Sequence, residues 1–227
     1  MRCRGCSEEC CSGSTDIVIH EPCSEGTDIR TRGEVTSDFE LQERIVRHCS
    51  PTLAGLKCGS MFKISSASHG LTISLRRVQS MVKTKGVRMM FLSSDEGGAL
   101  VYVYRHDLLS RRLTDPEVRS FLEEYGYHVS GVNRTLAELR RRFSQCPMPP
   151  EVGVFLDYPM VDVKGYIKNE GRCSRCVGCW KVYGNIEEAE RKFNMFRRCR
   201  DIYCHMLSEG YPISTLAVGP RSEPAVQ

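Results

Sequence analysis

The sequence lacks the long hydrophobic runs and the short local motifs that most readily identify a class of protein. No stretch approaches the ~18 consecutive apolar residues of a membrane-spanning helix. The first residues (MRCRGCSEECCSG) contain no apolar segment of the kind found in secretory signals. We therefore expect a cytoplasmic protein with no membrane partner.

Several fingerprints of common enzymes are missing as well. The chain contains no G-x-G-x-x-G, no Walker A loop, no H-E-x-x-H and no G-x-S-x-G. These absences argue against the common dinucleotide enzymes, nucleoside triphosphatases, zinc proteases and α/β hydrolases. They leave other kinds of enzyme open.

Cysteine is abundant but not abundant enough for a disulfide scaffold. The chain has 13 Cys in 227 residues, which is about 6% and below the ~8–10% typical of such scaffolds. In a reducing compartment these thiols stay reduced, bind metal or take part in redox chemistry.

The net charge of +4 is unevenly distributed. Residues 1–40 contain 4 Arg against 9 acidic residues, so the rest of the chain has 28 basic against 19 acidic residues. A basic body suggests a nucleic-acid module, with its candidate contacts at Arg111, Arg112, Arg140, Arg141, Arg197 and Arg198. However, three consecutive arginines on a helix span about 200° and form a poor phosphate track. Nucleic acid is thus a disfavoured partner, and solvated helix faces explain the charge equally well.

The order of apolar and polar segments predicts a single α+β domain over residues 39–216. A Cys-rich disordered tail (1–38) would precede it and a flexible tail (217–227) would follow it. The segments VRMMFL (87–92) and ALVYVY (99–104) are joined by a short turn-rich loop, which predicts an antiparallel hairpin. We expect a small mixed sheet of about four strands covered by seven or eight helices. A protein partner or self-association remains open.

The most distinctive pattern is Cys173-x-x-Cys176-x-x-Cys179. Three of the four ligands of ferredoxin-type iron–sulfur sites have this spacing. The fourth ligand of a zinc ion or an iron–sulfur cluster would come from Cys204 or His205. Nearby Arg172, Arg175 and Lys181 would favour thiolates and thus also a redox thiol. The first hypothesis is therefore a metal- or thiol-redox-linked binding or regulatory protein; surface thiols without a function are the alternative.

A second constellation consists of Glu151, Asp157 and Asp162, which lie close to predicted helix starts. Paired carboxylates suit acid–base catalysis or a hard cation, although helix N-termini also attract acidic residues for structural reasons. The second hypothesis is an enzyme of unknown reaction that uses a polar cleft around Glu151, Asp162, Lys57 and Lys181.

Six segments, in order, resemble the bacterial domain-of-unknown-function family 3793: residues 50–62, 100–105, 121–127, 149–171 (PPEVGVFLDYPMVDVKGYIKNEG), 178–184 (GCWKVYG) and 193–203. The resemblance implies a cytoplasmic single domain without an established activity. Polar positions that match the family are Thr52, Lys57, Arg105, Glu151, Tyr158, Asp162, Asn169, Lys181, Tyr183 and Cys199.

We take Thr52, Tyr158, Trp180 and Tyr183 as candidate ligand-binding residues. The predicted site lies where residues 149–166, the strand at 180–183 and residues 51–57 meet. Two positions depart from the family pattern, because Pro150 replaces a His and Asp157 replaces a Gly. The spacing of the three cysteines is not part of that pattern, so a cluster there would be specific to this chain.

Overall fold

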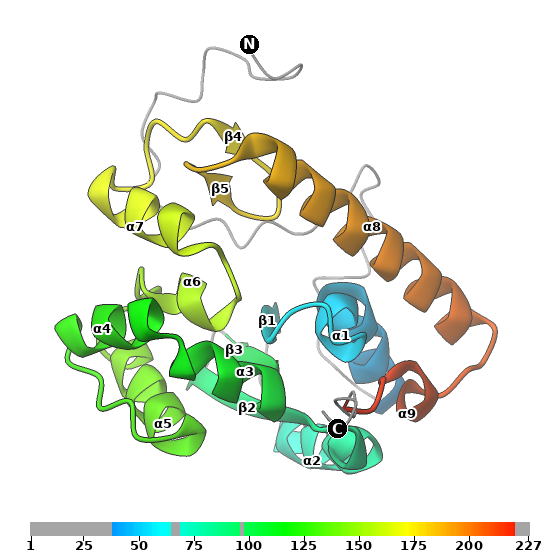
Figure 1. Cartoon of the computed structure of the whole chain (residues 1–227). Helices are drawn as coiled ribbons and strands as arrows, with labels where there is room; N and C mark the ends of the chain where they lie inside the picture. Colours follow the sequence, from blue (N-terminus) through cyan, green and yellow to red (C-terminus); the bar gives the residue numbers. More distant parts are fainter. Residues whose placement is uncertain (1–37, 65–68, 96–97, 221–227) are drawn as a thin grey trace, which may run out of the picture.

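The computed structural model describes residues 38–64, 69–95 and 98–220 (Figure 1). Most of the predicted N-terminal tail, with its five cysteines, and residues 221–227 of the predicted C-terminal tail lie outside these ranges. The helices are α1 (Asp38–Leu53), α2 (His69–Val82), α3 (His106–Thr114), α4 (Pro116–Glu124), α5 (Val132–Phe143), α6 (Val152–Phe155), α7 (Met160–Lys168), α8 (Ile186–Ser208) and α9 (Ile213–Leu216), and a 3₁₀ turn, η3 (Lys83–Lys85), follows α2.

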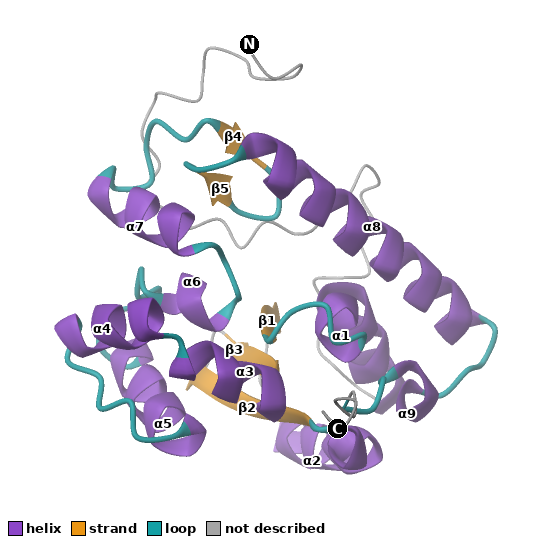
Figure 2. Cartoon of the chain, viewed as in Figure 1, coloured by secondary structure: helices purple, strands orange, loops and turns teal. Residues whose placement is uncertain are grey.

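A three-stranded antiparallel sheet forms the centre of the domain (Figure 2). Its strands are β1 (Gly59–Ile64), β2 (Val87–Asp95) and β3 (Gly98–Arg105), in the order β1-β3-β2. The predicted β2–β3 hairpin is confirmed, and its register shifts by a bulge between Phe91 and Ser93. Every residue of the central strand β3 is buried, which explains why its sequence is apolar at nearly every position.

Alternate residues of β3 belong to two different cores. Val101 and Val103 pack with α1, α2 and α9, whereas Leu100 and Tyr102 pack with α3 to α7. Side chains of a strand point alternately to its two faces, so the two cores lie on opposite sides of the sheet. This arrangement confirms the α+β class, with nine helices in the described part of the chain.

The remaining two strands form a separate ribbon rather than an extension of the sheet. β4 (Cys176–Val177) pairs antiparallel with β5 (Lys181–Val182). The predicted mixed sheet of about four strands is therefore a purely antiparallel sheet of three strands plus this ribbon. With two residues in each strand, the ribbon is stabilised by a third core, in which Trp180 packs against Phe193 of α8.

Two chain segments differ from the expectation in a way that shapes the site. The pattern around Ser50 and Pro51 predicts the start of a new helix, but α1 continues through Pro51 to Leu53. Packing also continues beyond residue 216, because Ala217 is buried and the Val218 amide donates to the Leu53 carbonyl at 3.0 Å. The C-terminal segment therefore closes over the end of α1.

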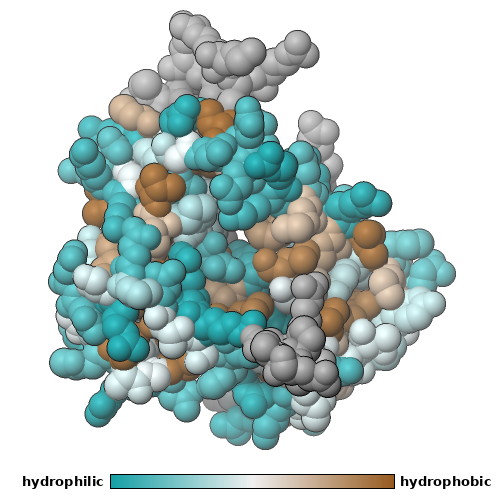
Figure 3. Space-filling view, viewed as in Figure 1, coloured by the Kyte–Doolittle hydropathy of each residue, from teal (hydrophilic) through white to brown (hydrophobic). Residues whose placement is uncertain are grey.

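The surface in the view of Figure 3 is mostly hydrophilic, and apolar side chains gather there only in small patches. Within the described residues, every helix is too short or too polar to cross a membrane.

Candidate functional site

The β4–β5 ribbon is attached to α7 by one buried carboxylate, Asp162. Its Oδ2 accepts a hydrogen bond from Trp180 Nε1 at 2.7 Å. Its Oδ1 accepts from the backbone amides of Tyr183 and Gly184 at 2.7 and 2.8 Å. Only 3% of Asp162 is exposed. Because charge-assisted bonds occupy both oxygens, Asp162 positions the ribbon and has little capacity left for acid–base catalysis.

This anchor places Trp180 against the loop between α6 and α7. The Trp180 ring stacks on Tyr158 with ring centres 5.0 Å apart, and it meets Phe193 edge-on at 4.5 Å. The Tyr158 hydroxyl donates to the Cys179 carbonyl at 3.3 Å. The ribbon, the α6–α7 loop and α8 therefore share one aromatic cluster.

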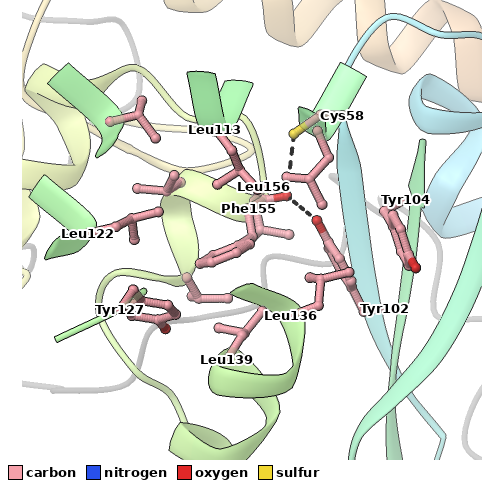
Figure 4. Close-up of a cluster of buried hydrophobic side chains, with 14 of the residues drawn as sticks. Cys58, Tyr102, Tyr104, Leu113, Leu122, Tyr127, Leu136, Leu139, Phe155 and Leu156 are labelled. Atoms are coloured by element: carbon pink, nitrogen blue, oxygen red, sulfur yellow. Dashed lines mark hydrogen bonds between the residues drawn. The ribbon is translucent and has the colours of Figure 1, made fainter. Parts of the chain in front are cut away.

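The α6–α7 loop is also fixed to the sheet and to the loop between α1 and β1. The Phe155 carbonyl accepts from the Tyr102 hydroxyl at 2.7 Å and from the Cys58 thiol at 3.6 Å (Figure 4). The Asp157 carboxylate accepts from the Cys58 amide at 3.0 Å. These contacts hold the segment just before β1 against the loop that carries Tyr158.

Asp157 replaces a Gly of the family pattern at a position where the backbone conformation favours Gly. Its φ of 63° lies in the left-handed region, where glycine is favoured. Here the Asp side chain gains the contact to Cys58 and an ion pair with Arg112, whose Nε lies 3.8 Å away. Arg112 also donates to the Tyr158 carbonyl at 2.6 Å. These interactions offset the strain of the backbone.

Lys57 lies at the centre of this arrangement. Its Nζ is 5.5 Å from the ring centre of Tyr158 and 5.6 Å from that of Phe196 on α8. Among the described residues, Nζ has neither a hydrogen-bond acceptor nor a salt-bridge partner. Burial lowers the pKa of the Lys57 ammonium from 10.5, and the nearby Cys58, Cys179 and Asp157 oppose this shift only in part. Lys57 is thus a half-buried amine beside two aromatic rings.

The other candidates for catalysis have structural partners. Glu151 is buried and accepts from the Tyr127 hydroxyl at 3.0 Å, while Arg142 lies 3.3 Å from it. Lys181 donates to the Gly171 carbonyl at 2.8 Å. The four charged residues of the predicted cleft therefore do not converge on one point, because Glu151 and Asp162 contact groups other than Lys57.

Two of the four candidate ligand-binding residues also have structural partners, and two do not lie with them. The hydroxyl groups of Thr52 and Ser60, both buried, lie 2.8 Å apart in a structural hydrogen bond. Tyr183 donates through its hydroxyl to the Arg172 carbonyl at 3.0 Å. Of the four candidates, Tyr158 and Trp180 remain beside Lys57 and its aromatic cluster.

The three cysteines of the ribbon region lie at different depths. Cys173 is exposed, Cys176 is buried and Cys179 is intermediate. The structure brings no group of three or more His, Cys, Asp or Glu side chains into a metal-binding arrangement within its described ranges. Cys204 and His205 lie near the C-terminal end of α8, where Cys204 is half-buried and His205 exposed. The metal site stays a prediction without geometric support.

Sequence reasoning did not identify Phe196 as part of the site, and it assigned Arg112 to a nucleic-acid surface. Phe196 appears in the sequence only as one member of the apolar stripe of α8. Arg112 contacts Asp157 and the Tyr158 carbonyl, and Arg141 pairs with Glu138 at 2.6 Å. Arg197 also donates to the Asn194 side chain at 3.1 Å. At least three of the six proposed nucleic-acid contacts are therefore engaged within the protein.

Comparison with known proteins gives one match, to the family described as protein of unknown function (DUF3793), over residues 45–217. The chain belongs to the DUF3793 family. No curated protein and no solved structure matches it. The matched region contains the sheet, the ribbon and all elements around Lys57, so the site described above lies within the DUF3793 domain.

Proposed function

We propose that this DUF3793 protein is an enzyme in which the Lys57 amine attacks the carbonyl carbon of a small organic substrate. The observation that carries the proposal is an amine held between two aromatic rings, with no acceptor among the described residues and with a lowered pKa. Lysines activated by desolvation form Schiff bases with carbonyl compounds in many enzymes.

The balance of energies supports an activated amine. Desolvation disfavours the charged form of an amine, and Lys57 is half-buried. The rings at 5.5 and 5.6 Å oppose this effect through cation–π contacts of about 0.5–2 kcal/mol each, but the pKa of Lys57 is lowered overall. A lysine with its ordinary pKa is unprotonated in fewer than about 1 in 1,000 molecules at pH 7, so each unit of lowering raises the reactive fraction about tenfold.

The reaction would proceed through the groups around Nζ. The neutral amine adds to the carbonyl carbon, and both of its protons pass to the carbonyl oxygen, which leaves as water when the C=N bond forms. Asp157, whose carboxylate is about one-third exposed, would relay the first of these protons from the nitrogen to the oxygen. The rings of Tyr158 and Phe196 would exclude bulk water from the carbon–nitrogen bond.

Reductive trapping tests the proposal directly. The protein is incubated with glyoxylate and cyanoborohydride, and the modified lysines are identified by peptide mass spectrometry. We expect Lys57 to be modified at least tenfold faster than Lys63, an exposed lysine on β1, at pH 7. Lys57→Arg should abolish the dominant adduct, whereas Lys63→Arg should leave it unchanged. Equal rates at the two lysines would refute the proposal.

The second candidate is the thiol-redox half of the first hypothesis, centred on Cys179. This residue lies within electrostatic reach of the Lys57 ammonium, and a neighbouring cation favours the reactive thiolate. We expect iodoacetamide to modify Cys179 several-fold faster in the wild type than in Lys57→Met. A metal would instead appear as stoichiometric zinc or iron that a Cys173/Cys176/Cys179→Ser variant loses. The thiol candidate supports a cytoplasmic location, since thiols stay reduced there.

A further inference from the structure

We infer that a second pocket, between α6, α7 and the ribbon, binds an aromatic monocarboxylate. It is lined by Pro150, Val152, Gly153, Leu156, Tyr158, Asp162, Val163, Tyr166, Trp180 and Lys181. Its cavity volume is about 50 Å³, and it opens to solvent. Neither Lys57 nor Phe196 lines it, but Tyr158 does, so this pocket adjoins the site proposed for the amine and shares one ring with it.

The walls of the pocket suit a flat apolar group. Three aromatic residues, Tyr158, Tyr166 and Trp180, face aliphatic side chains of α6 and α7. Ligand pockets are typically lined by such side chains, with a few polar groups that fix the orientation of the ligand. Because Tyr158 and Trp180 already stack on each other, a ligand ring would meet the exposed parts of this pair rather than separate them.

The charged groups of the pocket determine which end group the ligand has. Lys181 donates one hydrogen bond, to the Gly171 carbonyl at 2.8 Å, and an ammonium has three donors. Two donors of Lys181 are thus unused among the described residues. Asp162, in contrast, already accepts from Trp180, Tyr183 and Gly184.

A carboxylate therefore finds donors in this pocket, whereas a cationic ligand does not find an equivalent acceptor. An ammonium group would have to compete for the occupied oxygens of Asp162 and would be repelled by Lys181. The arrangement selects a ring with one negative end, held by a charge-assisted bond to Lys181.

Three probes with the same ring test this inference: 4-fluorobenzoate, 4-fluorobenzyl alcohol and 4-fluorobenzylamine. Binding is followed by ¹⁹F NMR and by the fluorescence of Trp180, the only Trp of the chain. We expect the carboxylate to bind about tenfold more tightly than the alcohol, as one charge-assisted bond allows. The amine should bind more weakly than the alcohol.

Variants of Lys181 assign the preference to this pocket. Lys181→Met should reduce the ratio of carboxylate to alcohol affinity to about one, whereas Lys181→Arg should preserve it. Lys168→Met, which removes an exposed cation at the C-terminal end of α7, is the matched control and should also preserve it. The inference is overturned if the benzoate shows no saturable binding at millimolar concentration, if the amine binds most tightly, or if Lys181→Met keeps the preference. The wild-type and Lys181→Arg results decide the matter even if Lys181→Met does not fold.

Discussion

Replacement of Asp162 by Ala should detach the β4–β5 ribbon from α7. The substitution removes three hydrogen bonds of 2.7–2.8 Å from Trp180, Tyr183 and Gly184 to a carboxylate that is 3% exposed. Hydrogen bonds to charged groups contribute about 1.5–3 kcal/mol each, and bonds to one shared group are not additive. We therefore expect a loss of about 4 kcal/mol in the stability of the ribbon.

Chemical denaturation with two signals measures this loss. Trp180 fluorescence follows the ribbon, whereas far-UV circular dichroism follows the helices. In Asp162→Ala, the fluorescence transition should occur at a lower urea concentration than the circular dichroism transition, because the ribbon then unfolds before the domain. Glu117→Ala is the control, since it breaks only the exposed pair with Lys164, worth about 0–1 kcal/mol. A loss below about 1 kcal/mol in Asp162→Ala would refute the anchoring role.

Three further variants test other parts of the structure by unfolding measurements. Gly165→Ala should destabilise the protein by about 1–3 kcal/mol, although Ala favours helices, because the new Cβ would lie 2.5 Å from the Tyr183 ring; an increase in stability would contradict this packing. Burial and neighbouring arginines lower the pKa of His48 from 6.5 to about 4. The wild type should therefore lose up to about 3 kcal/mol of stability as the pH falls from 6.5 to 4, whereas His48→Gln should keep this stability. Lys57→Met should be more stable than the wild type at pH 7. Its advantage should shrink as the pH rises from the lowered pKa of the folded protein to 10.5, the pKa in the unfolded chain; a pH-independent difference would argue against the lowered pKa.

The helices and the hairpin could be predicted from the sequence because their signals are local. Asn185, a residue type that favours helix starts, caps α8 by accepting from the Glu188 amide at 3.2 Å, and the apolar run of β3 indicates a central strand. Pro51 shows the limit of such signals. It is a typical residue for a helix start, yet the tertiary contacts of α1 with the sheet extend the helix through it.

The sequence predicted which segments meet, but not the partners of their side chains. The sequence indicates that residues 149–166, 51–57 and the ribbon meet, and they do so around Tyr158. It cannot indicate that Asp162 binds Trp180 and the amides beyond it, because that partnership depends on how the ribbon folds back. Nor can it indicate that Lys57 meets Phe196, since the two residues lie far apart in the chain and Phe196 belongs to an ordinary apolar stripe.

The hydrogen-bond partners of the charged residues separate structural roles from functional ones. Glu151 and Asp162 are buried acids, and each has donors that offset the cost of burial. Lys57 is half-buried, and among the described residues it has two ring faces but no hydrogen-bond acceptor. A methionine would fill the same space between the rings without the charge, so the amine adds nothing to the packing that an apolar side chain could not supply. The unpaired amine is therefore better explained by chemistry at Nζ than by stability, and the trapping experiment at Lys57 addresses the explanation that the contacts favour.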